Sequence, residues 1–325
     1  MSTSATPVDQ APARRRVVDP AIPIAYGCIV VLLLVGSLYS PNFLSGVYLL
    51  QQLKVASFLG VVATGMMFVI LIGQIDLSVP WVLTTGAMMA SAATAHGALG
   101  AALSVPFGLL CGAALGLLNG FVVAYMRVPS MIVTMAVNAV AQGLMVAYTG
   151  GFSPRDSASP FMRTLATGYL IPGVANGVLV WAAVALIAIF VLSRTTFGRS
   201  LYAIGNRERA AYLSGIPTRR VTLCVFVISG VLSALGGILL TGYAAKAAQG
   251  MGDAYLLPSI AAVVLGGTNV LGGRGSYFGT IAGVLLVTLL QSILSVMQIE
   301  EAGRQLIYGA VIIVMLLLYG RQRSL

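Results

Sequence analysis

Apolar residues dominate this chain in long stretches, which short groups of charged residues separate. The stretches without Asp, Glu, Lys or Arg are residues 20–53, 55–75, 77–126, 128–154, 164–193, 221–245, 254–273, 275–299 and 305–320. A helix that crosses a membrane needs about 20 predominantly apolar residues. The stretch 77–126 is long enough for two such helices, so the pattern predicts about ten spans.

The predicted fold class is an all-α polytopic membrane protein with about ten transmembrane helices. Some helices are expected to be broken, because several of the 38 glycines lie where backbone would line a cavity. The expected spans lie near residues 21–40, 55–73, 78–95, 99–123, 129–149, 175–193, 221–244, 255–270, 277–297 and 304–320.

The segments outside the spans complete the domain organisation. Residues 1–20 are polar and rich in Pro, Ala and Ser, and we expect a disordered cytoplasmic N-terminus there. The apolar run that follows is long for a signal peptide and has no Ala-x-Ala cleavage site, so it predicts an uncleaved first span. Residues 21–320 are expected to form the transmembrane domain, with a cytoplasmic loop at about 194–220, and residues 321–325 a cytoplasmic C-terminus.

The basic residues support this topology, because cytoplasmic loops of membrane proteins carry an excess of Lys and Arg. Ten crossings from an internal N-terminus place five basic residues outside, namely Lys54, Arg155, Arg163, Lys246 and Arg304. The other thirteen of the 18 fall in the cytoplasm. Both chain ends are therefore predicted on the cytoplasmic side.

Composition excludes several classes of protein. Charged residues make up 8% of the 325 residues, against about 25% in soluble domains. The net charge of +10 indicates cytoplasmic loops near anionic lipid headgroups rather than nucleic-acid binding. One His and three scattered Cys provide no metal site or disulfide framework, and neither Lys follows a glycine as a P-loop requires. We expect a non-enzymatic protein without metal or cofactor.

The first candidate site is the segment 73–80, Gly-Gln-Ile-Asp-Leu-Ser-Val-Pro. A lone aspartate between long apolar runs is costly in a membrane unless it is paired or faces water. Asp76 or Ser78 could cap a helix that begins near Pro80, since both residue types accept bonds from free N–H groups. The alternative is a polar element at the inner mouth of a translocation path.

The second candidate lies in the longest cytoplasmic loop, about residues 194–220. Residues 206–213 are expected to form a short amphipathic helix that Ser214, Gly215 and Pro217 end. A solvated basic loop is the simple alternative. Ala210, Ala211, Leu213 and Ile216 are unusually apolar for such a loop, and exposed apolar residues with a charged rim favour a docking surface.

The third candidate is the glycine-rich segment 266–275, which follows an apolar run and has five glycines in ten positions. It lacks the spacing and strand context of a nucleotide-binding loop, so a tight turn between spans is expected. Its start, together with the two residues before it, resembles the segment 71–77, and this pattern hints at an internal repeat.

These three segments resemble those of the membrane permeases of ribose-type ABC sugar importers in bacteria, over roughly residues 50–320. That family shows Gly-Gly-Ile-Asp-Leu-Ser-Val-Gly at the first segment, where this chain has Gln74 and Pro80 in place of two glycines. The third matches Gly-Gly-Thr-Ser-Leu-x-Gly-Gly with Asn269 for Ser. The second matches Gly-x-Asn-x-x-Ala-Ala-x-x-Ser-Gly-Ile with Arg207 at the Asn position.

The resemblance implies an importer subunit in the bacterial inner membrane with an ABC-importer permease architecture. Two permease chains, of one kind or paralogous, would form the path, while separate cytoplasmic ATPase subunits hydrolyse ATP and a periplasmic binding protein delivers a sugar or polyol. The loop would couple to the ATPase. The residues implied in coupling are Gly205, Glu208, Ala210, Ala211, Leu213, Ser214, Gly215 and Ile216.

Polar residues inside the spans are candidates for the path. They could hydrogen-bond sugar hydroxyls in transit, or they could bond between helices. The candidates are Gln74, Asp76, Asn138, Gln142 and Asn269. An ion-coupled secondary transporter with Asp76 as its ion-linked carboxylate and an ABC permease for branched-chain amino acids remain as alternatives. A membrane-embedded enzyme is disfavoured, because catalytic groups are lacking.

Overall fold

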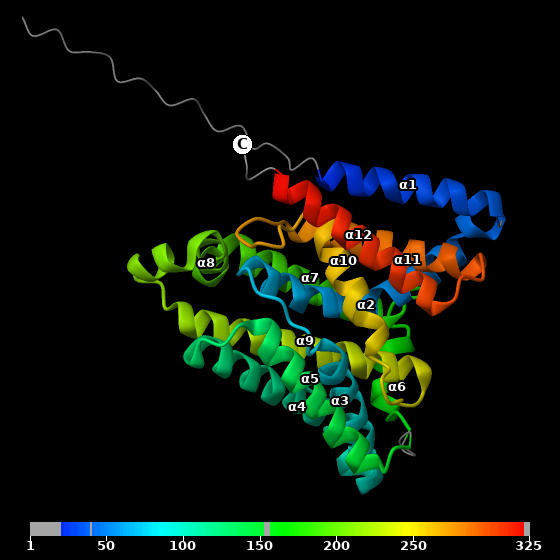
Figure 1. Cartoon of the computed structure of the whole chain (residues 1–325). Helices are drawn as coiled ribbons and strands as arrows, with labels where there is room; N and C mark the ends of the chain where they lie inside the picture. Colours follow the sequence, from blue (N-terminus) through cyan, green and yellow to red (C-terminus); the bar gives the residue numbers. More distant parts are fainter. Residues whose placement is uncertain (1–20, 40, 153–156, 322–325) are drawn as a thin grey trace, which may run out of the picture.

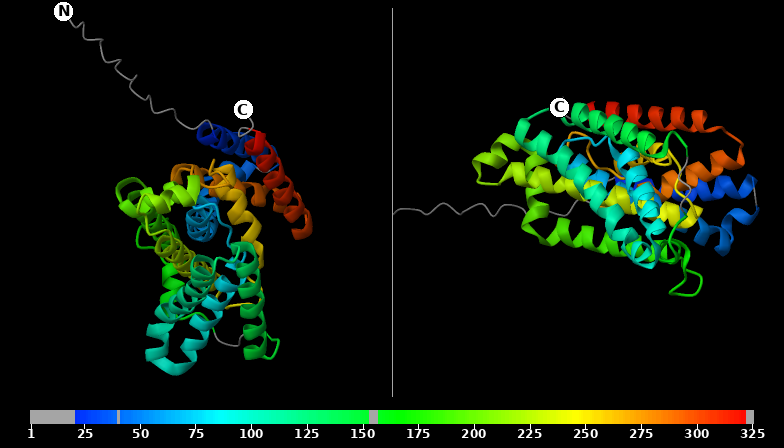
Figure 2. Two further views of the ribbon diagram at one scale, coloured as in Figure 1. Left: turned by 60° about the vertical axis from the view of Figure 1, so that its left-hand side comes forward. Right: turned by 90° about the horizontal axis from the view of Figure 1, so that it is seen from below.

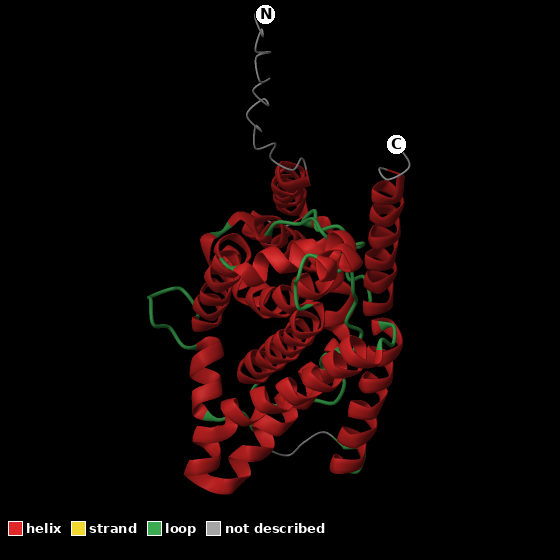
Figure 3. Cartoon of the chain, turned by 90° about the vertical axis from the view of Figure 1, so that its left-hand side faces the viewer, coloured by secondary structure: helices red, strands yellow, loops and turns green. Residues whose placement is uncertain are grey.

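The computed structural model describes residues 21–39, 41–152 and 157–321. Within these ranges the chain is almost entirely helical and forms no strand, apart from two isolated β-bridges (Figure 3). The all-α prediction is therefore confirmed. The expected disordered N-terminus and residues 322–325 of the expected C-terminal tail lie outside the described residues.

Ten α-helices coincide with the ten predicted spans within a few residues, except that α2 begins earlier and α10 ends earlier than predicted. They are α1 (Ala21–Tyr39), α2 (Gly46–Leu71), α3 (Val79–Ala93), α4 (Gly97–Met126), α5 (Ser130–Thr149), α7 (Asn176–Arg194), α9 (Thr218–Ala244), α10 (Leu256–Leu265), α11 (Tyr277–Val296) and α12 (Glu301–Arg321). The remaining helices are α6 (Pro160–Thr167), α8 (Thr196–Leu213) and the 3-10 helices η1 (Pro41–Leu44), η2 (Thr94–His96) and η3 (Asp253–Tyr255).

Six helical stretches of the described part are long and apolar enough to cross a membrane. They are α2, the stretch Val79–Met126, α5, α7, α9 and α11. The stretch Val79–Met126 has 48 residues and contains both α3 and α4. Shorter apolar helices lie at Pro23–Leu38 and Asp253–Leu265. The chain is thus a multi-pass membrane protein, while the expected count of about ten spans is not confirmed by this criterion.

Helices α2 and α9 form the centre of the bundle. Every residue from Ala56 to Leu71 of α2 is buried, which requires neighbours on all sides of that helix. Those neighbours are α7, α9, α10 and α11, whereas α9 also contacts α3, α4 and α6. Helices α3, α4 and α5 form one flank, and α1, α11 and α12 form the other (Figure 1).

Small residues allow α4 and α9 to approach closely, as the four-residue spacing of glycines predicts. A Cβ atom on Gly112 would overlap the carbonyl oxygen of Gly230, and one on Gly116 would overlap that of Phe226. Both neighbours are backbone atoms that cannot rotate away. The glycines of α4 are therefore packing residues of the bundle.

Different basic residues lie at the two ends of the helix pair that α2 and α9 form. At one end, Lys54 of α2 lies 5.0 Å from the ring centroid of Tyr243 in α9. At the other end, α8 lies beside the end of α2, and Arg127 contacts it. Both views in Figure 2 show α8 at the outer edge of the molecule. Basic residues that the sequence assigns to opposite sides of the membrane thus lie at opposite ends of the bundle.

Candidate functional site

The three candidate segments meet at one place through four glycines, Gly73, Gly205, Gly272 and Gly273, which we call the glycine joint. A Cβ atom on Gly205 would overlap the carbonyl oxygen of Leu71 and the amide nitrogen of Gly273. The amide of Gly273 donates to that Leu71 oxygen at 2.9 Å. Backbone therefore contacts backbone across the end of α2, helix α8 and the α10–α11 turn.

The two helices that lead into the glycine joint, α2 and α10, end in the same way. At the end of α2, Gly73 has φ +75° and its amide donates to the carbonyl of Ile70. At the end of α10, Gly267 has φ +87° and donates to Val264 in the matching position. The next amide in each case donates to the residue five positions back, the Schellman pattern. The short sequence similarity between these segments thus corresponds to one shared helix end.

Helix α8 carries the predicted coupling residues and is longer than expected. It begins at Thr196, where the hydroxyl of Thr195 accepts from the amide of Gly198, rather than near residue 206. The backbone of Arg207 is extended, with φ −163° and ψ 98°, so the helix kinks there. The amphipathic segment predicted at 206–213 therefore corresponds to the arm beyond the kink, and it ends at Ser214 as expected.

The two arms of α8 differ in exposure. Before the kink, Leu201 and Ile204 are buried, and the hydroxyl of Tyr202 donates to the carbonyl of Gly275 at 3.1 Å. Burial raises the pKa of Tyr202 above its ordinary value. After the kink, Leu213 is 79% exposed. The first arm is attached to the bundle, and the second presents apolar surface to solvent.

The expectation that Ala211 is exposed is wrong. Its exposed fraction is 4%, because its face of the helix turns toward the bundle, and it belongs to the main hydrophobic core. Ile216 is partly buried against the same core. The remaining predicted coupling residues beyond the kink lie at the surface, and they are Glu208, Ala210, Leu213, Ser214 and Gly215. Gly205, before the kink, lies in the glycine joint.

An ion pair connects the second arm of α8 to the flank that α3, α4 and α5 form. Arg127 Nη1 lies 3.2 Å from Glu208 Oε1, and it is the one salt bridge found among the described residues. Arg127 ends α4 with φ +61°, a left-handed conformation that is unusual for a residue other than glycine. Both side chains are about half exposed.

This ion pair borders a cavity of about 320 Å³, which we call the inner cavity. Its polar lining consists of Gln74, Arg127, Glu208, Arg219 and Thr222, and the rest is aliphatic. Gln74 lies in the connection from α2 to α3, residues 72–78. The inner cavity therefore lies between α8, the α4–α5 connection and the first candidate segment.

Asp76 lies deeper along the same connection and is 2% exposed. Its carboxylate accepts from the amide of Ser78 at 3.0 Å, from the Ser78 hydroxyl at 2.6 Å and from Ser229 of α9 at 2.7 Å. Asn119 of α4 in turn donates to the Ser78 hydroxyl at 2.7 Å. Asp76 thus holds the start of α3, whereas Ser78 makes no side-chain capping bond.

The other predicted path residues are distributed unevenly. Asn138 of α5 accepts from the amide of Trp81 at 3.3 Å and borders a second cavity of about 290 Å³, together with Asp253 and Gln305. Gln142 lies one turn further along α5 and is exposed. Asn269 instead accepts from the amide of Leu271 within its own turn. The structure places Gln74 and Asp76 in the segment 72–80, which contains the α2–α3 connection and the start of α3, and it places Asn138 of α5 beside that segment. It leaves Asn269 in the α10–α11 turn.

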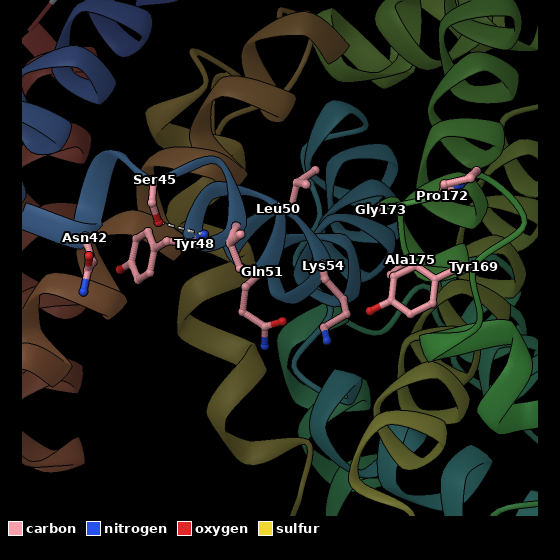
Figure 4. Close-up of a pocket in the computed structure, with 11 residues that line it drawn as sticks. Asn42, Ser45, Tyr48, Leu50, Gln51, Lys54, Tyr169, Pro172, Gly173 and Ala175 are labelled. Atoms are coloured by element: carbon pink, nitrogen blue, oxygen red, sulfur yellow. Dashed lines mark hydrogen bonds between the residues drawn. The ribbon is translucent and has the colours of Figure 1, made fainter.

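A larger groove of about 950 Å³ lies at the opposite end of α2. Gln51 and Lys54 of α2 and Tyr169 of the α6–α7 connection extend into it (Figure 4). The lining of this groove combines amide, hydroxyl and ammonium groups with aliphatic carbon. This arrangement can hold a polar organic molecule or a polar protein loop.

Sequence reasoning did not single out Arg127, Arg219 and Thr222 of the inner cavity, Ser229 of the hydrogen-bond network, or Asp253 of the second cavity. Arg127 is the single charge between two long apolar runs, and this isolation is a signal that could have identified it. Ser229 has no such signal, since serine is common in spans. Asp253 borders the second cavity and directly precedes the charge-free run 254–273, as Asp76 precedes 77–126.

Comparison with known proteins gives consistent matches. The family model described as "Branched-chain amino acid transport system / permease component" matches residues 48–316. The chain is 36% identical to the ribose import permease protein RbsC of Haemophilus influenzae, over 89% of this chain and 90% of that protein. It is 34% identical to the RbsC protein of Bacillus subtilis, over 89% of each chain.

A third relative has a different named sugar. The L-arabinose ABC transporter permease protein AraH of Azospirillum brasilense is 29% identical, over 86% of this chain and 82% of that protein. No solved structure shows a significant match.

Proposed function

The chain belongs to the family of branched-chain amino acid transport system permease components, and we propose that it is the membrane subunit of a bacterial ABC importer for a sugar or related polyol. Relatives that cover about nine tenths of the chain are named as permeases for ribose. Another is named for L-arabinose. These names favour a sugar over a branched-chain amino acid, although the family description names the latter.

The observation that carries the proposal is the glycine joint. An importer powered by a separate ATPase needs a surface for that partner and a stiff connection from it to the helices of the path. Helix α8 offers an exposed arm with Leu213 at its end, and Gly205 attaches the other arm directly to the ends of α2 and the α10–α11 turn. A movement of α8 would therefore move the α2–α3 connection and the α10–α11 turn together.

The path in this proposal follows the segment 72–80, which contains the α2–α3 connection and the start of α3. The inner cavity lies at one end of this segment beside Gln74, and the second cavity lies at the other end beside Pro80. Asp76 lies between them in its hydrogen-bond network. The polar groups that flank the segment suit a neutral hydroxylated substrate, because each can donate to or accept from a hydroxyl group.

The membrane topology in this proposal has about ten spans with both chain ends in the cytoplasm. It is supported by the positions of α1 to α5, α7 and α9 to α12 at the predicted spans and by the separation of basic residues between the two ends. The groove near Lys54 then faces the periplasm, where a binding protein would deliver the substrate. A second permease chain, identical or paralogous, would complete the assembly with two ATPase subunits.

The test is uptake of labelled ribose and arabinose by cells that express the chain with its candidate ATPase and binding protein. We expect uptake to persist when the proton and sodium gradients are collapsed while ATP is maintained. Uptake that stops with a gradient would instead support the ion-coupled transporter with Asp76 at its centre. Uptake of leucine but of neither sugar would reassign the substrate to branched-chain amino acids.

A further inference from the structure

The inner cavity has the size and chemistry of a small-molecule site. Its volume of about 320 Å³ lies at the lower end of the range for ligand pockets, about 300–1,000 Å³, so it suits one small ligand. The guanidinium groups of Arg127 and Arg219 and the amide of Gln74 offer donors. The Glu208 carboxylate and the Thr222 hydroxyl offer acceptors.

The charge balance of the inner cavity favours a neutral ligand. Arg127 is paired with Glu208 at 3.2 Å, and Arg219 lies 6.0 Å from the centre of the Tyr125 ring. Only one positive charge is therefore left without a carboxylate, whereas sites for phosphate usually gather several. A polyol carries both donors and acceptors without net charge, and it matches the mixed lining.

The wall of the inner cavity contains the ion pair that bridges two parts of the molecule. Arg127 comes from the α4–α5 connection, and Glu208 is the first residue beyond the kink of α8. A movement of the outer arm of α8 would separate the two side chains and open the cavity on that side. Because the pair is half exposed, it is weak enough to break and form again in each cycle.

We propose that the inner cavity is the last substrate site before release into the cytoplasm, and that the Arg127–Glu208 pair is its gate. The ligand is a monosaccharide or polyol of the transported kind, so the proposal rests on the function proposed above. Gln74, Arg219 and Thr222 bind its hydroxyl groups. Helix α8 opens the gate when its outer arm moves with the ATPase.

The first test measures occupancy directly in inside-out vesicles that contain the assembled complex. In a background with Cys28, Cys111 and Cys224 replaced by Ser, Val128→Cys, which lines the inner cavity without a role in binding hydroxyl groups, is labelled with a membrane-impermeant thiol reagent. We expect ribose, or arabinose where uptake assays identify it, to slow labelling about tenfold at ten times its Kd. Met126→Cys is the matched control, since it lies two residues away at the end of α4, is exposed and lies outside the lining.

Two results of the labelling test would overturn the site. One is labelling of Val128→Cys that the transported sugar does not slow, in a complex whose wild-type form takes up that sugar. The other is equal protection by inorganic phosphate alone, which would make the cavity an anion site. Failure of the wild-type complex to take up any sugar would instead contradict the proposed function, so the two failures are distinguishable.

The second test addresses the gate through the number of ATP molecules hydrolysed per sugar transported. Arg127→Gln and Glu208→Gln should each raise this ratio about two- to fivefold, the effect expected from one exposed ion pair. The exchange of Arg127→Glu with Glu208→Arg should restore it. Arg127→Gln is the decisive single variant, because Arg127 lies outside the segment proposed to dock on the ATPase.

Arg220→Gln provides the control for this second test, since it removes a neighbouring positive charge on α9 that does not line the cavity. Co-purification of the ATPase should be unchanged in Arg127→Gln and in Arg220→Gln, because both residues lie outside the segment proposed to dock on the ATPase. A gate is contradicted if the exchanged pair couples no better than the single variants. It is also contradicted if both single variants match the wild type.

Discussion

Helix α8 is held by two contacts of opposite character. At the glycine joint, backbone atoms of Gly205, Leu71 and Gly273 touch without intervening side chains. At the ion pair, the half-exposed side chains of Arg127 and Glu208 connect α8 to the flank that α3, α4 and α5 form. The first contact tolerates no added atom, and the second can break at little cost. Helix α8 thus has one rigid attachment, at the glycine joint, and one reversible attachment, at the ion pair. This combination allows its outer arm to move while the other arm stays fixed to the bundle.

The largest expected effect comes from filling the glycine joint. Gly205→Val should destabilise the protein by more than about 3 kcal/mol, because the added atoms overlap backbone of two other segments. Thermal unfolding of the purified chain and its amount in the membrane measure this. Gly143→Ala is the matched control, since nothing lies within 4 Å of its added Cβ, and it should be neutral or slightly stabilising. A wild-type melting temperature for Gly205→Val would remove the rigid side of the comparison.

A second prediction concerns the connection that leaves the glycine joint. Asp76→Leu should cost about 2–3 kcal/mol, because it leaves the donors of Ser78 and Ser229 without an acceptor in a buried site. Asp76→Asn should keep most of the stability and transport, since its amide can accept from Ser78 and donate to Ser229. Membrane expression and uptake are measured together. Loss of transport in Asp76→Asn at normal expression would show that the negative charge itself is needed.

The third prediction separates the buried and exposed faces of the outer arm of α8. Ala211→Glu should lower stability by about 1–2 kcal/mol, because it places a charge against the core. Leu213→Glu and Ala210→Glu should change stability by less than about 0.5 kcal/mol and yet reduce co-purification of the ATPase and uptake. If Leu213→Glu leaves both assembly and uptake intact, the outer arm is a solvated basic segment and docking occurs elsewhere.

The smallest effect is expected at the ion pair. A double-mutant cycle with Arg127→Gln and Glu208→Gln should give a coupling energy of about 0.2–1 kcal/mol in thermal or denaturant unfolding. High salt should reduce that energy, since both side chains are half exposed. A coupling energy above 3 kcal/mol would mean that the contact is as rigid as the glycine joint, and the contrast between the two sides of α8 would disappear.

The sequence by itself predicted the helices and their ends well. Nine charge-free runs correspond to ten helices, with α3 and α4 sharing one run, because whether a segment enters a membrane depends mainly on its own hydropathy. The turn at Gly215 and the helix end at Gly73 were equally local, since a positive φ favours glycine whatever lies around it. The helix α8 was underestimated, because Gly198 and Gly205 resemble helix breakers when their close neighbours are unknown.

Only the tertiary structure decided how these elements meet. Arg127 and Glu208 are 81 positions apart, and Asp76 and Ser229 are 153 positions apart. No local pattern relates such residues, because their contact depends on how α2, α4, α8 and α9 cross. The burial of Ala211 was decided in the same way, since the sequence shows that one face of a helix is apolar but not whether a neighbour covers it. Hydropathy is a property of each segment by itself, whereas packing depends on contacts between segments. The glycine joint and the inner cavity arise from such contacts, so only the tertiary structure revealed them.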